Sequence, residues 1–560
     1  MPTQSPNRQI ETPAIESIAE AIGGGDAPLG ISFKELADAT ASSMNFESMA
    51  RESMRLYGEW LKILLGASER ELPPKDARFA DAVWRDNPMY KALAQSYLAF
   101  CDAVDHVIDD NPDWRKRERA RFLTGILTSA MAPTNTLIGN PAALKKAFDS
   151  GGMSLVRGAR NMAGDMAQGD GLPSQVKKSD FKLGENLAAT PGAVVFRNDL
   201  LELLQYQPTT TVVREIPTLM ILPPIGKYYF MDLAPGRSFA EHAVRKGIPF
   251  FATSWRNPRK EHGAWGLDDY VQTLVHAVDV VCEISGSGRL NILGLCAGGI
   301  ISTMLMNYLA TTGDHRVNAA SFGVMLLDFC MEAPLGAFQS SPVLSLARQQ
   351  STKKGILPAN SLAQVFAWMR PNDLVWNYWV NNYLEGKDPP SFDILAWSVD
   401  GTNLPGKLHA QFLDIFQNNP LPEAGAITVL GEPVDLKRIK VETFITAAMT
   451  DHLTPWKACY RSTQLLGGES TFVLSNGGHI AALINPPGNP RSSYYAGPKP
   501  GPDPDKWLQQ AEKRTGTWWE VWADWTLKRS GGERDTPTTL GSEEYPALCK
   551  APGTYVHEPA

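Results

Sequence analysis

RLNILGLCAGGIISTMLMNYLATTG, residues 289–313, places a cysteine between a strand pattern and a helix pattern. Its centre, Gly294-Leu295-Cys296-Ala297-Gly298-Gly299, is the G-x-S-x-G nucleophile elbow with cysteine in place of serine. Glycines beside Cys296 permit the tight turn that raises the sulfur above a sheet. The N-terminus of the following helix stabilises a thiolate and offers backbone N–H groups, so Ala297 is the expected oxyanion donor. The alternative is a buried structural cysteine in a glycine-rich turn.

The sequence around this elbow alternates strands with helices. Such alternation predicts a parallel sheet with helical crossovers. Strands are expected at 209–215, 218–222, 248–255, 289–296 and 441–449, one more within 317–329, and a strand followed by a loop at 470–479. Helices are expected at 268–285 and 301–313. Residues of about 331–435, rich in aromatic, Asn and Pro residues, interrupt this rhythm and are interpreted as an inserted cap.

The remainder of the chain has a different character. Residues 1–30 are expected to be flexible, and 31–190 to form a mostly helical domain, with helical patterns at 32–65 and 89–108. Residues 191–560 then form the catalytic domain.

A nucleophile elbow requires an acid after a late strand and a histidine after the last one, in that order. Asp451 directly follows the strand pattern at 441–449, and His479 lies in the loop that ends the strand-and-loop segment 470–479. His479 is expected to take the thiol proton and later to activate a hydroxyl, while Asp451 orients the imidazole. Asp328, which also ends a strand, is a rival acid, and Asp451 could instead cap the helix that follows it. The neighbouring His452 is a candidate auxiliary residue, with a structural role as the equal alternative.

A second oxyanion donor is expected in the loop after an early strand. LMILPPIGKYY, residues 219–229, supplies such a loop. Pro223 and Pro224 carry no N–H, so Ile225 is the candidate donor.

Composition excludes several classes of protein. The 560 residues carry a net charge of −7, without the basic stripe of a nucleic-acid binder. The six cysteines are widely spaced and form no CxxC pair, so neither a disulfide framework nor a zinc ribbon is indicated, and a cytoplasmic location is expected. No metal or cofactor is expected. The sequence lacks a signal peptide pattern and any apolar run of about 18 residues, so no transmembrane segment is expected.

These motifs resemble the polyhydroxyalkanoate (PHA) synthases along nearly the whole chain. The matching segments are GLCAGG (294–299), PPIGKYYFMDLAPGRSF (223–239), SWRNP (254–258), WGLDDYV (265–271), DHLTPW (451–456), NDLVWNYWVNNYLEGKDPPSFDILAWSVDGTNLP (372–405), RFADAVWRDNPMYKALAQSYL (78–98) and TPGAVVFRNDLLELLQY (190–206). One departure concerns the oxyanion loop, where many members read PP-x-Ile-Asn-Lys-x-Tyr and this chain has lost one residue and carries Gly226 for the Asn.

The resemblance implies an α/β-hydrolase catalytic domain with a mobile cap, preceded by a helical domain, and an active homodimer of the single-polypeptide type (class I/II). It implies a Cys-His-Asp triad at Cys296, His479 and Asp451. The implied substrate is (R)-3-hydroxyacyl-CoA, with CoA as leaving group. The implied partners are the growing polyester, the polymer granule surface and granule-associated proteins.

Polymerisation requires water to be kept from the acyl-enzyme. Trp376, Trp379 and Trp397 of the insertion are candidates for a lid, and core or dimer contacts are the equal alternative. Two rival functions remain: a thioesterase on the same fold, and a catalytically silent coat protein of polymer granules. An intact triad argues against the coat protein.

Overall fold

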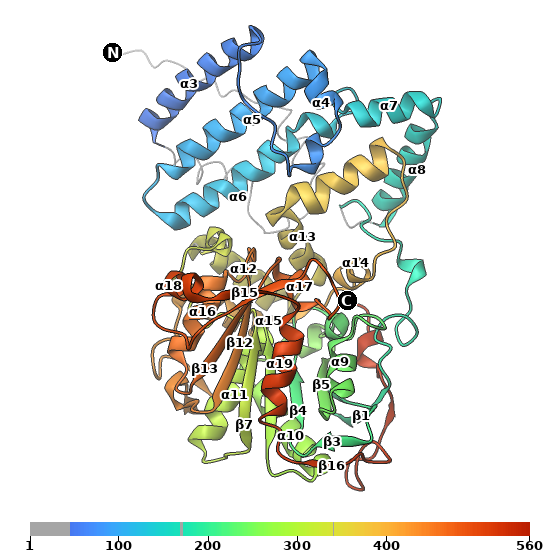
Figure 1. Cartoon of the computed structure of the whole chain (residues 1–560), viewed down its shortest axis with the longest axis vertical. Helices are drawn as coiled ribbons and strands as arrows, with labels where there is room; N and C mark the ends of the chain where they lie inside the picture. The colour runs from blue at the N-terminus through green and yellow to red at the C-terminus, as the bar shows by residue number, and fades with distance from the viewer. Residues whose placement is uncertain (1–44, 169–171, 340) are drawn as a thin grey trace, which may run out of the picture. The chain divides into compact units, whose positions relative to one another are not determined.

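The computed structural model of the chain describes residues 45–168, 172–339 and 341–560 (Figure 1). The segment expected to be flexible, 1–30, lies outside the described residues. The chain divides into two compact units. One comprises Met1–Gln175 and Ala363–Pro389, and the other comprises Val176–Leu362 and Pro390–Ala560. The helical unit therefore includes 27 residues from within the segment 331–435 that the sequence analysis treated as one insertion of the catalytic domain.

Helix starts in the first unit follow local sequence signals. The side chains of Asn45, Asn87, Asp113 and Asn140 each accept a backbone N–H of the helix that they precede, as N-cap residues do. The helices are α3 (Phe46–Leu64), α4 (Val83–Asp86), α5 (Pro88–Asp109), α6 (Trp114–Ala130), α7 (Pro141–Asp149) and α8 (Met153–Gln168). The helix expected at 89–108 is α5, and the described part of that expected at 32–65 is α3.

Aromatic side chains form the core of the helical unit. The Phe79 ring meets that of Trp84 edge-on at 4.9 Å, and Trp84 meets Tyr90 at 5.4 Å. Phe79 and Trp84 are fully buried. Part of the motif at 78–98 is therefore explained by packing within this unit.

The returning segment 363–389 packs into the helical unit through its aromatic residues. The Trp376 indole N–H donates to Ser129 Oγ at 3.2 Å, and that of Trp379 donates to the Asn135 carbonyl at 3.1 Å. This segment contains η7 (Asn372–Trp376) and η8 (Trp379–Leu384), both π-helical. Two of the three tryptophans proposed for a lid thus have partners within the helical unit.

The second unit is built on an 11-stranded sheet with the order β15-β14-β13-β12-β7-β6-β4-β5-β2-β1-β17. Strands β5, β4, β6, β7, β12 and β13 are parallel, and the strands at both edges are antiparallel. The bounds are β1 (Gly192–Arg197), β2 (Leu201–Tyr206), β4 (Thr218–Ile221), β5 (Phe250–Trp255), β6 (Leu290–Leu295), β7 (Val317–Gly323), β12 (Glu442–Ala448), β13 (Ser470–Ser475), β14 (Ser493–Ala496), β15 (Glu512–Thr515) and β17 (Cys549–Lys550).

Short strand pairs and further helices complete the second unit. The pairs are β3 (Val212–Arg214) with β16 (Glu533–Asp535), β8 (Ile356–Leu357) with β9 (Leu404–Pro405), and β10 (Thr428–Val429) with β11 (Glu432–Pro433). Between β7 and β12 the chain forms α12 (Ser341–Lys354), α13 (Ala359–Met369, which crosses into the helical unit), α14 (Asp393–Ser398) and α15 (Gly406–Asn418). The other helices are α9 (Phe239–Arg245), α10 (Leu267–Ser285), α11 (Ala297–Thr311), α16 (Trp456–Leu465), α17 (His479–Leu483), α18 (Pro504–Gln510) and α19 (Trp518–Leu527).

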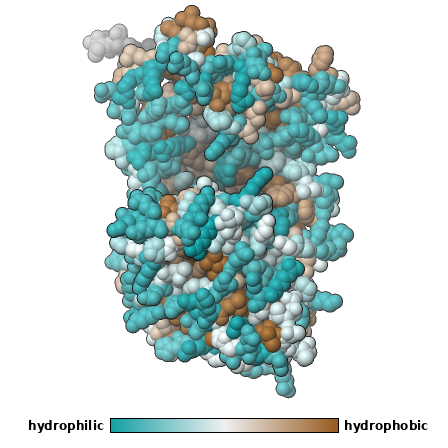
Figure 2. Space-filling model, viewed as in Figure 1, coloured by the Kyte–Doolittle hydropathy of each residue, from teal (hydrophilic) through white to brown (hydrophobic). Residues whose placement is uncertain are grey.

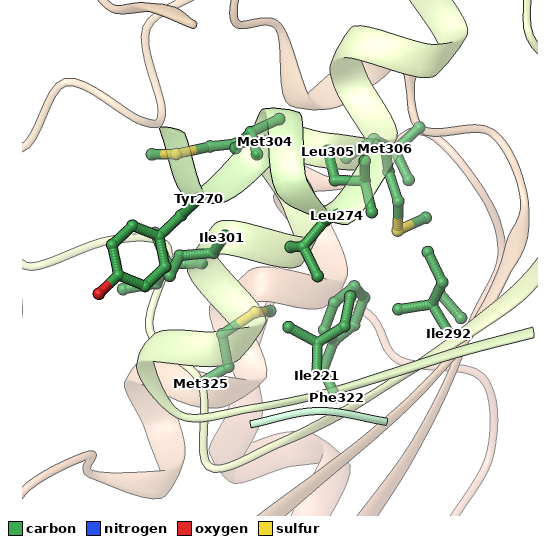
Figure 3. Close-up of a cluster of buried hydrophobic side chains, with 14 of the residues drawn as sticks. Ile221, Tyr270, Leu274, Ile292, Ile301, Met304, Leu305, Met306, Phe322 and Met325 are labelled. Atoms are coloured by element: carbon green, nitrogen blue, oxygen red, sulfur yellow. The ribbon is translucent and has the colours of Figure 1, made fainter. Parts of the chain in front are cut away.

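Helices cover both faces of the parallel strands, so those strands are apolar on both sides. On β6, Ile292 belongs to one hydrophobic cluster and its neighbour Leu293 to the other. Helices α10, α11 and α16 pack on the first face, where Figure 3 shows Ile292, Ile301 and Phe322 gathered between helix and sheet. Helices α9 and α19 cover the second face. This double covering fixes the carboxyl ends of the strands, where the candidate residues lie.

The surface in view is mostly hydrophilic, with apolar side chains emerging among polar ones on both units (Figure 2). Within the described ranges, no helix combines the length and apolarity needed to cross a bilayer.

Candidate active site

Cys296 occupies the connection between β6 and α11 with a strained backbone. Its φ is 48° and its ψ is −124°, values that a residue with a side chain rarely adopts. The turn is held by main-chain bonds, because Cys296 N–H donates to the Gly323 carbonyl at 2.9 Å and Gly299 N–H donates to the Cys296 carbonyl at 2.9 Å. This is the geometry that the elbow motif predicts.

The neighbouring glycines are required by space. A Cβ on Gly294 would lie 2.6 Å from Ser302 Oγ, and one on Gly298 would lie 2.5 Å from the Ile221 carbonyl oxygen. Such contacts are shorter than real Cβ atoms make. The main chain of the elbow therefore packs directly against the main chain at the end of β4. The candidate oxyanion loop follows β4.

Asp451 and His479 meet at the carboxyl ends of β12 and β13. Asp451 follows β12, and His479 is the first residue of α17 after β13. His479 Nδ1 lies 2.6 Å from Asp451 Oδ2. Both residues are buried, with exposed fractions of 8% and 7%.

The electrostatics of this pair favour its charged form. Burial lowers the pKa of His479, but hydrogen bonds to Asp451 and to the Cys296 thiol, together with their charges, outweigh burial and raise it to about 10. Burial raises the pKa of Asp451, and its bonds to His479 and Thr454 more than reverse this, leaving that pKa below the ordinary value. The two pKa shifts run in opposite directions, and each favours the charged form of its own group.

The rival acid, Asp328, has other partners. Its carboxylate pairs with the Arg461 guanidinium and accepts from Asn419 Nδ2 at 2.9 Å. Burial raises the pKa of Asp328, and these bonds with that of the Cys330 backbone N–H lower it overall. Asp328 is thus a structural ion-pair residue in this arrangement, and the structure brings Asp451 to the histidine.

Asp451 does not cap the helix that follows it. The N-cap of α16 is Pro455, which makes no side-chain capping bond. Asp451 Oδ1 instead accepts the backbone N–H groups of Leu453 at 2.8 Å and Thr454 at 3.0 Å. The carboxylate is therefore held by the turn that it begins. His452, in the same turn, is partly buried.

The two candidate oxyanion donors lie at the starts of different elements. Ala297 is the first residue of α11 and is buried, and the first N–H groups of a helix have no acceptor within the helix. Ile225 lies after β4 and is partly buried against the core. Gly226, which follows it, has a φ of 93°, a conformation that suits glycine.

Trp397, the third tryptophan proposed for a lid, packs on this loop. Its indole N–H donates to the Lys227 carbonyl at 2.8 Å, and its ring lies 5.2 Å from that of Phe230. A Cβ on Gly226 would lie 3.1 Å from the same ring. The cap helix α14 is therefore attached to the loop that carries Ile225.

Sequence reasoning missed residues that hold His479 in place. The indole N–H groups of Trp518 and Trp519 donate to the carbonyls of Ala482 and Leu483, both at 2.8 Å, at the end of the helix that His479 begins. Their signal was the tryptophan-rich run at 518–525. Thr454, within the motif DHLTPW, was also missed; its hydroxyl lies 3.2 Å from His479 Nδ1.

Other features do not form part of this site. A pocket of 480 Å³ is lined by residues at the start of β7, among them His315, Val317 and Asn318, and by residues 438–441. It lies at the amino ends of the strands, whereas Cys296 follows the carboxyl end of β6. Across the described ranges, no group of three or more His, Cys, Asp or Glu residues is placed to hold a metal ion.

Comparison with known proteins identifies the family. Residues 75–243 match the N-terminus of poly-beta-hydroxybutyrate polymerase, and residues 221–486 match the alpha/beta hydrolase fold. The chain is 44% identical over 514 residues to Poly(3-hydroxyalkanoate) polymerase 2 of Ectopseudomonas oleovorans, with 90% of this chain and 91% of the relative covered. It is 39% identical over 507 residues to Poly(3-hydroxyalkanoate) polymerase subunit PhaC of Cupriavidus necator, with 89% and 85% covered.

These matches confirm the predicted α/β-hydrolase fold preceded by a helical region. The chain belongs to the poly(3-hydroxyalkanoate) polymerases, acyltransferase-type enzymes of the α/β-hydrolase superfamily.

Proposed function

We propose that the chain polymerises (R)-3-hydroxyacyl-CoA into polyester and releases CoA, with Cys296, His479 and Asp451 as its catalytic triad. The observation that carries this proposal is the 2.6 Å contact between His479 Nδ1 and Asp451 Oδ2 next to a cysteine elbow. Family membership supplies the substrate class, since the relatives are named poly(3-hydroxyalkanoate) polymerases.

In the first step, Cys296 Sγ attacks the thioester carbonyl of the substrate. The thiol proton passes to His479 Nε2, which is suited to hold it because the pKa of His479 is raised to about 10. The bond from the carbonyl carbon to CoA sulfur breaks, and the proton on Nε2 goes to the leaving CoA thiolate. The products are free CoA and a thioester on Cys296, so one thioester replaces another.

The negative oxygen that forms during this attack requires donors. The backbone N–H of Ala297, at the start of α11, and that of Ile225 are the proposed pair. The positive end of the α11 dipole adds to the same stabilisation.

In the second step, the hydroxyl of another hydroxyacyl unit attacks the Cys296 thioester. His479 Nε2 takes the hydroxyl proton and returns it to the sulfur as the carbon–sulfur bond breaks. An oxygen ester forms and the thiol is restored. Trp397 supports the exclusion of water, because it attaches the cap helix α14 to the oxyanion loop.

We infer the remaining properties from the family. The enzyme acts as a homodimer of the single-polypeptide type in the cytoplasm. It works at the surface of polymer granules with granule-associated proteins, and requires no cofactor beyond the CoA of its substrate. Size-exclusion chromatography with light scattering tests the dimer, and a fluorescent fusion tests the location.

Product analysis tests the function. Purified protein receives 3-hydroxybutyryl-CoA or 3-hydroxydecanoyl-CoA, while free thiol and product mass are followed together. CoA release with a high-mass polyester is the expected result, and the preferred substrate gives the chain-length class. Release of free hydroxy acid alone would identify a thioesterase instead. Cys296→Ala is expected to abolish CoA release, and retained activity would refute the mechanism.

A further inference from the structure

Thr454 has three contacts that connect it to both partners of the proposed acid–histidine pair. Its hydroxyl Oγ1 lies 2.6 Å from Asp451 Oδ2 and 3.2 Å from His479 Nδ1. Its backbone N–H donates to Asp451 Oδ1 at 3.0 Å. The residue is buried, so water does not replace these contacts readily.

We propose that Thr454 is a positioning residue that fixes the orientation of His479, keeping a proton on Nδ1 so that Nε2 is the nitrogen that takes up the Cys296 thiol proton. The inference rests on the proposed function, because it concerns the same triad.

The protons around one carboxylate oxygen, Asp451 Oδ2, determine which nitrogen of His479 is protonated. Asp451 Oδ2 is an acceptor, and it faces both Thr454 Oγ1 and His479 Nδ1 at 2.6 Å. The hydroxyl has one proton, which it gives to the carboxylate, and its lone pairs then face Nδ1. Oδ2 and Oγ1 thus both offer lone pairs to Nδ1. Only an Nδ1 that carries a proton satisfies this arrangement, which leaves Nε2 as the acceptor for the thiol proton.

The backbone keeps the hydroxyl in this place. Pro455 restricts the main chain of the preceding residue, Thr454, to extended conformations. The β-branched side chain of Thr454 also has few rotamers. The Cys459 thiol donates to the Thr454 carbonyl at 3.4 Å from within α16. The backbone N–H and carbonyl of Thr454 are therefore both hydrogen-bonded, which fixes the position of its side chain.

The test measures how fast iodoacetamide alkylates Cys296, between pH 5 and 9, by mass spectrometry of the peptide that contains it. Thr454→Val removes the hydroxyl and keeps the shape. We expect the rate at pH 7 to fall about tenfold, as for loss of one hydrogen bond to a charged group, with a changed pH profile. Thr454→Ser keeps the hydroxyl and should stay within about threefold of the unmodified protein.

A matched control lies on the next helix. Thr463 is also buried. Its hydroxyl donates to the Tyr460 carbonyl and accepts from Gln464 Nε2, and both of these residues lie in α16. Thr463→Val should alkylate at the unmodified rate. The proposal is overturned if Thr454→Val behaves as Thr463→Val does, or if Thr454→Ser loses as much as Thr454→Val. Should Thr454→Val fail to fold, Thr454→Ala and Thr454→Ser give the same comparison.

A further variant separates this inference from the proposed function. Alkylation needs no CoA substrate, so it does not depend on polymerisation. If His479→Gln alkylates as fast as the unmodified protein, the triad itself is refuted. If His479→Gln is slow and Thr454→Val is normal, only the role of Thr454 is refuted. With substrate, Thr454→Val should lower kcat about tenfold at an unchanged KM, because the residue acts through His479 and does not touch the acyl group.

Discussion

Replacing Asp451 by Asn tests the acid–histidine pair with little change of shape. Asp451 Oδ1 accepts two backbone N–H groups, so the Asn oxygen should remain on that side. The new NH₂ group then faces His479 Nδ1 and Thr454 Oγ1, where Oδ2 stood. A donor in this place favours an unprotonated Nδ1, so the proton of the neutral imidazole moves to Nε2. Nε2 can then no longer accept the thiol proton.

The expected loss of kcat is about 10³- to 10⁴-fold, the size associated with a wrong histidine tautomer in a triad. Stability should fall as well. The Asp451 carboxylate helps to raise the pKa of His479 to about 10, and loss of a hydrogen bond to a charged group costs about 1.5–3 kcal/mol.

The stability difference should depend on pH. The raised pKa of His479 means that its contribution is complete below pH 6.5 and is lost as pH rises toward 10. The lowered pKa of Asp451 means that its contribution is present above the ordinary carboxyl value of 3.8 and is lost as pH falls below it. The difference between the unmodified protein and Asp451→Asn should therefore be largest at pH 4–6.5.

Two assays decide the matter. One follows CoA release from 3-hydroxyacyl-CoA, and the other follows thermal unfolding from pH 4 to 10. Asp328→Asn is the matched control, because it removes a buried carboxylate that pairs with Arg461 instead of the histidine. It should lose stability while keeping CoA release within about tenfold. A variant Asp451→Asn with near-normal CoA release, or equal effects of the two variants, would refute the assignment.

Two smaller changes test the loop next to the elbow. Gly298→Ala should cost about 1–3 kcal/mol by thermal unfolding and slow CoA release, because its Cβ would meet main chain at the end of β4; Gly288→Ala, with open space around its Cβ, should be neutral. Trp397→Phe keeps an aromatic ring but removes the bond to the Lys227 carbonyl, so kcat for CoA release should fall several-fold for a loss of about 1 kcal/mol. Trp507→Phe, which removes a similar bond to the Pro498 carbonyl, should leave kcat unchanged.

The sequence predicted the elbow and the alternation of strands and helices along the chain around it, because both depend on short-range patterns. Cys296 required glycines at fixed offsets, and Asp451 and His479 followed strands in a known order. The expected strand at 209–215 was only partly informative, since β3 lies outside the main sheet and pairs with β16. The antiparallel strands β1 and β2 were missed, because Arg197 and Glu202 interrupt their apolar pattern.

Contacts between distant parts of the chain could not be predicted. Residues 363–389 read as part of a cap, yet Tyr383 donates to Asp165, 218 residues earlier. The tryptophan-rich segment that forms α19 was interpreted only as a tail, whereas the indole groups of Trp518 and Trp519 donate to the helix that begins with His479. Thr454 lies within the motif DHLTPW, but its proposed role depends on the direction of one hydroxyl. No periodicity or spacing carries that information.

The origin of the raised His479 pKa bears on both proposed steps. Part of the rise comes from the hydrogen bond and charge of Cys296 and part from Asp451. Acylation removes the first part, since a thioester sulfur carries neither charge nor proton. Burial then opposes the charged imidazole with only Asp451 to offset it, so we expect the pKa of His479 to fall when Cys296 is acylated. Histidine NMR of the protein before and after alkylation of Cys296 measures this shift, and an unchanged pKa would contradict it. A residue that holds a proton for the leaving CoA would thereby become a base for the incoming hydroxyl.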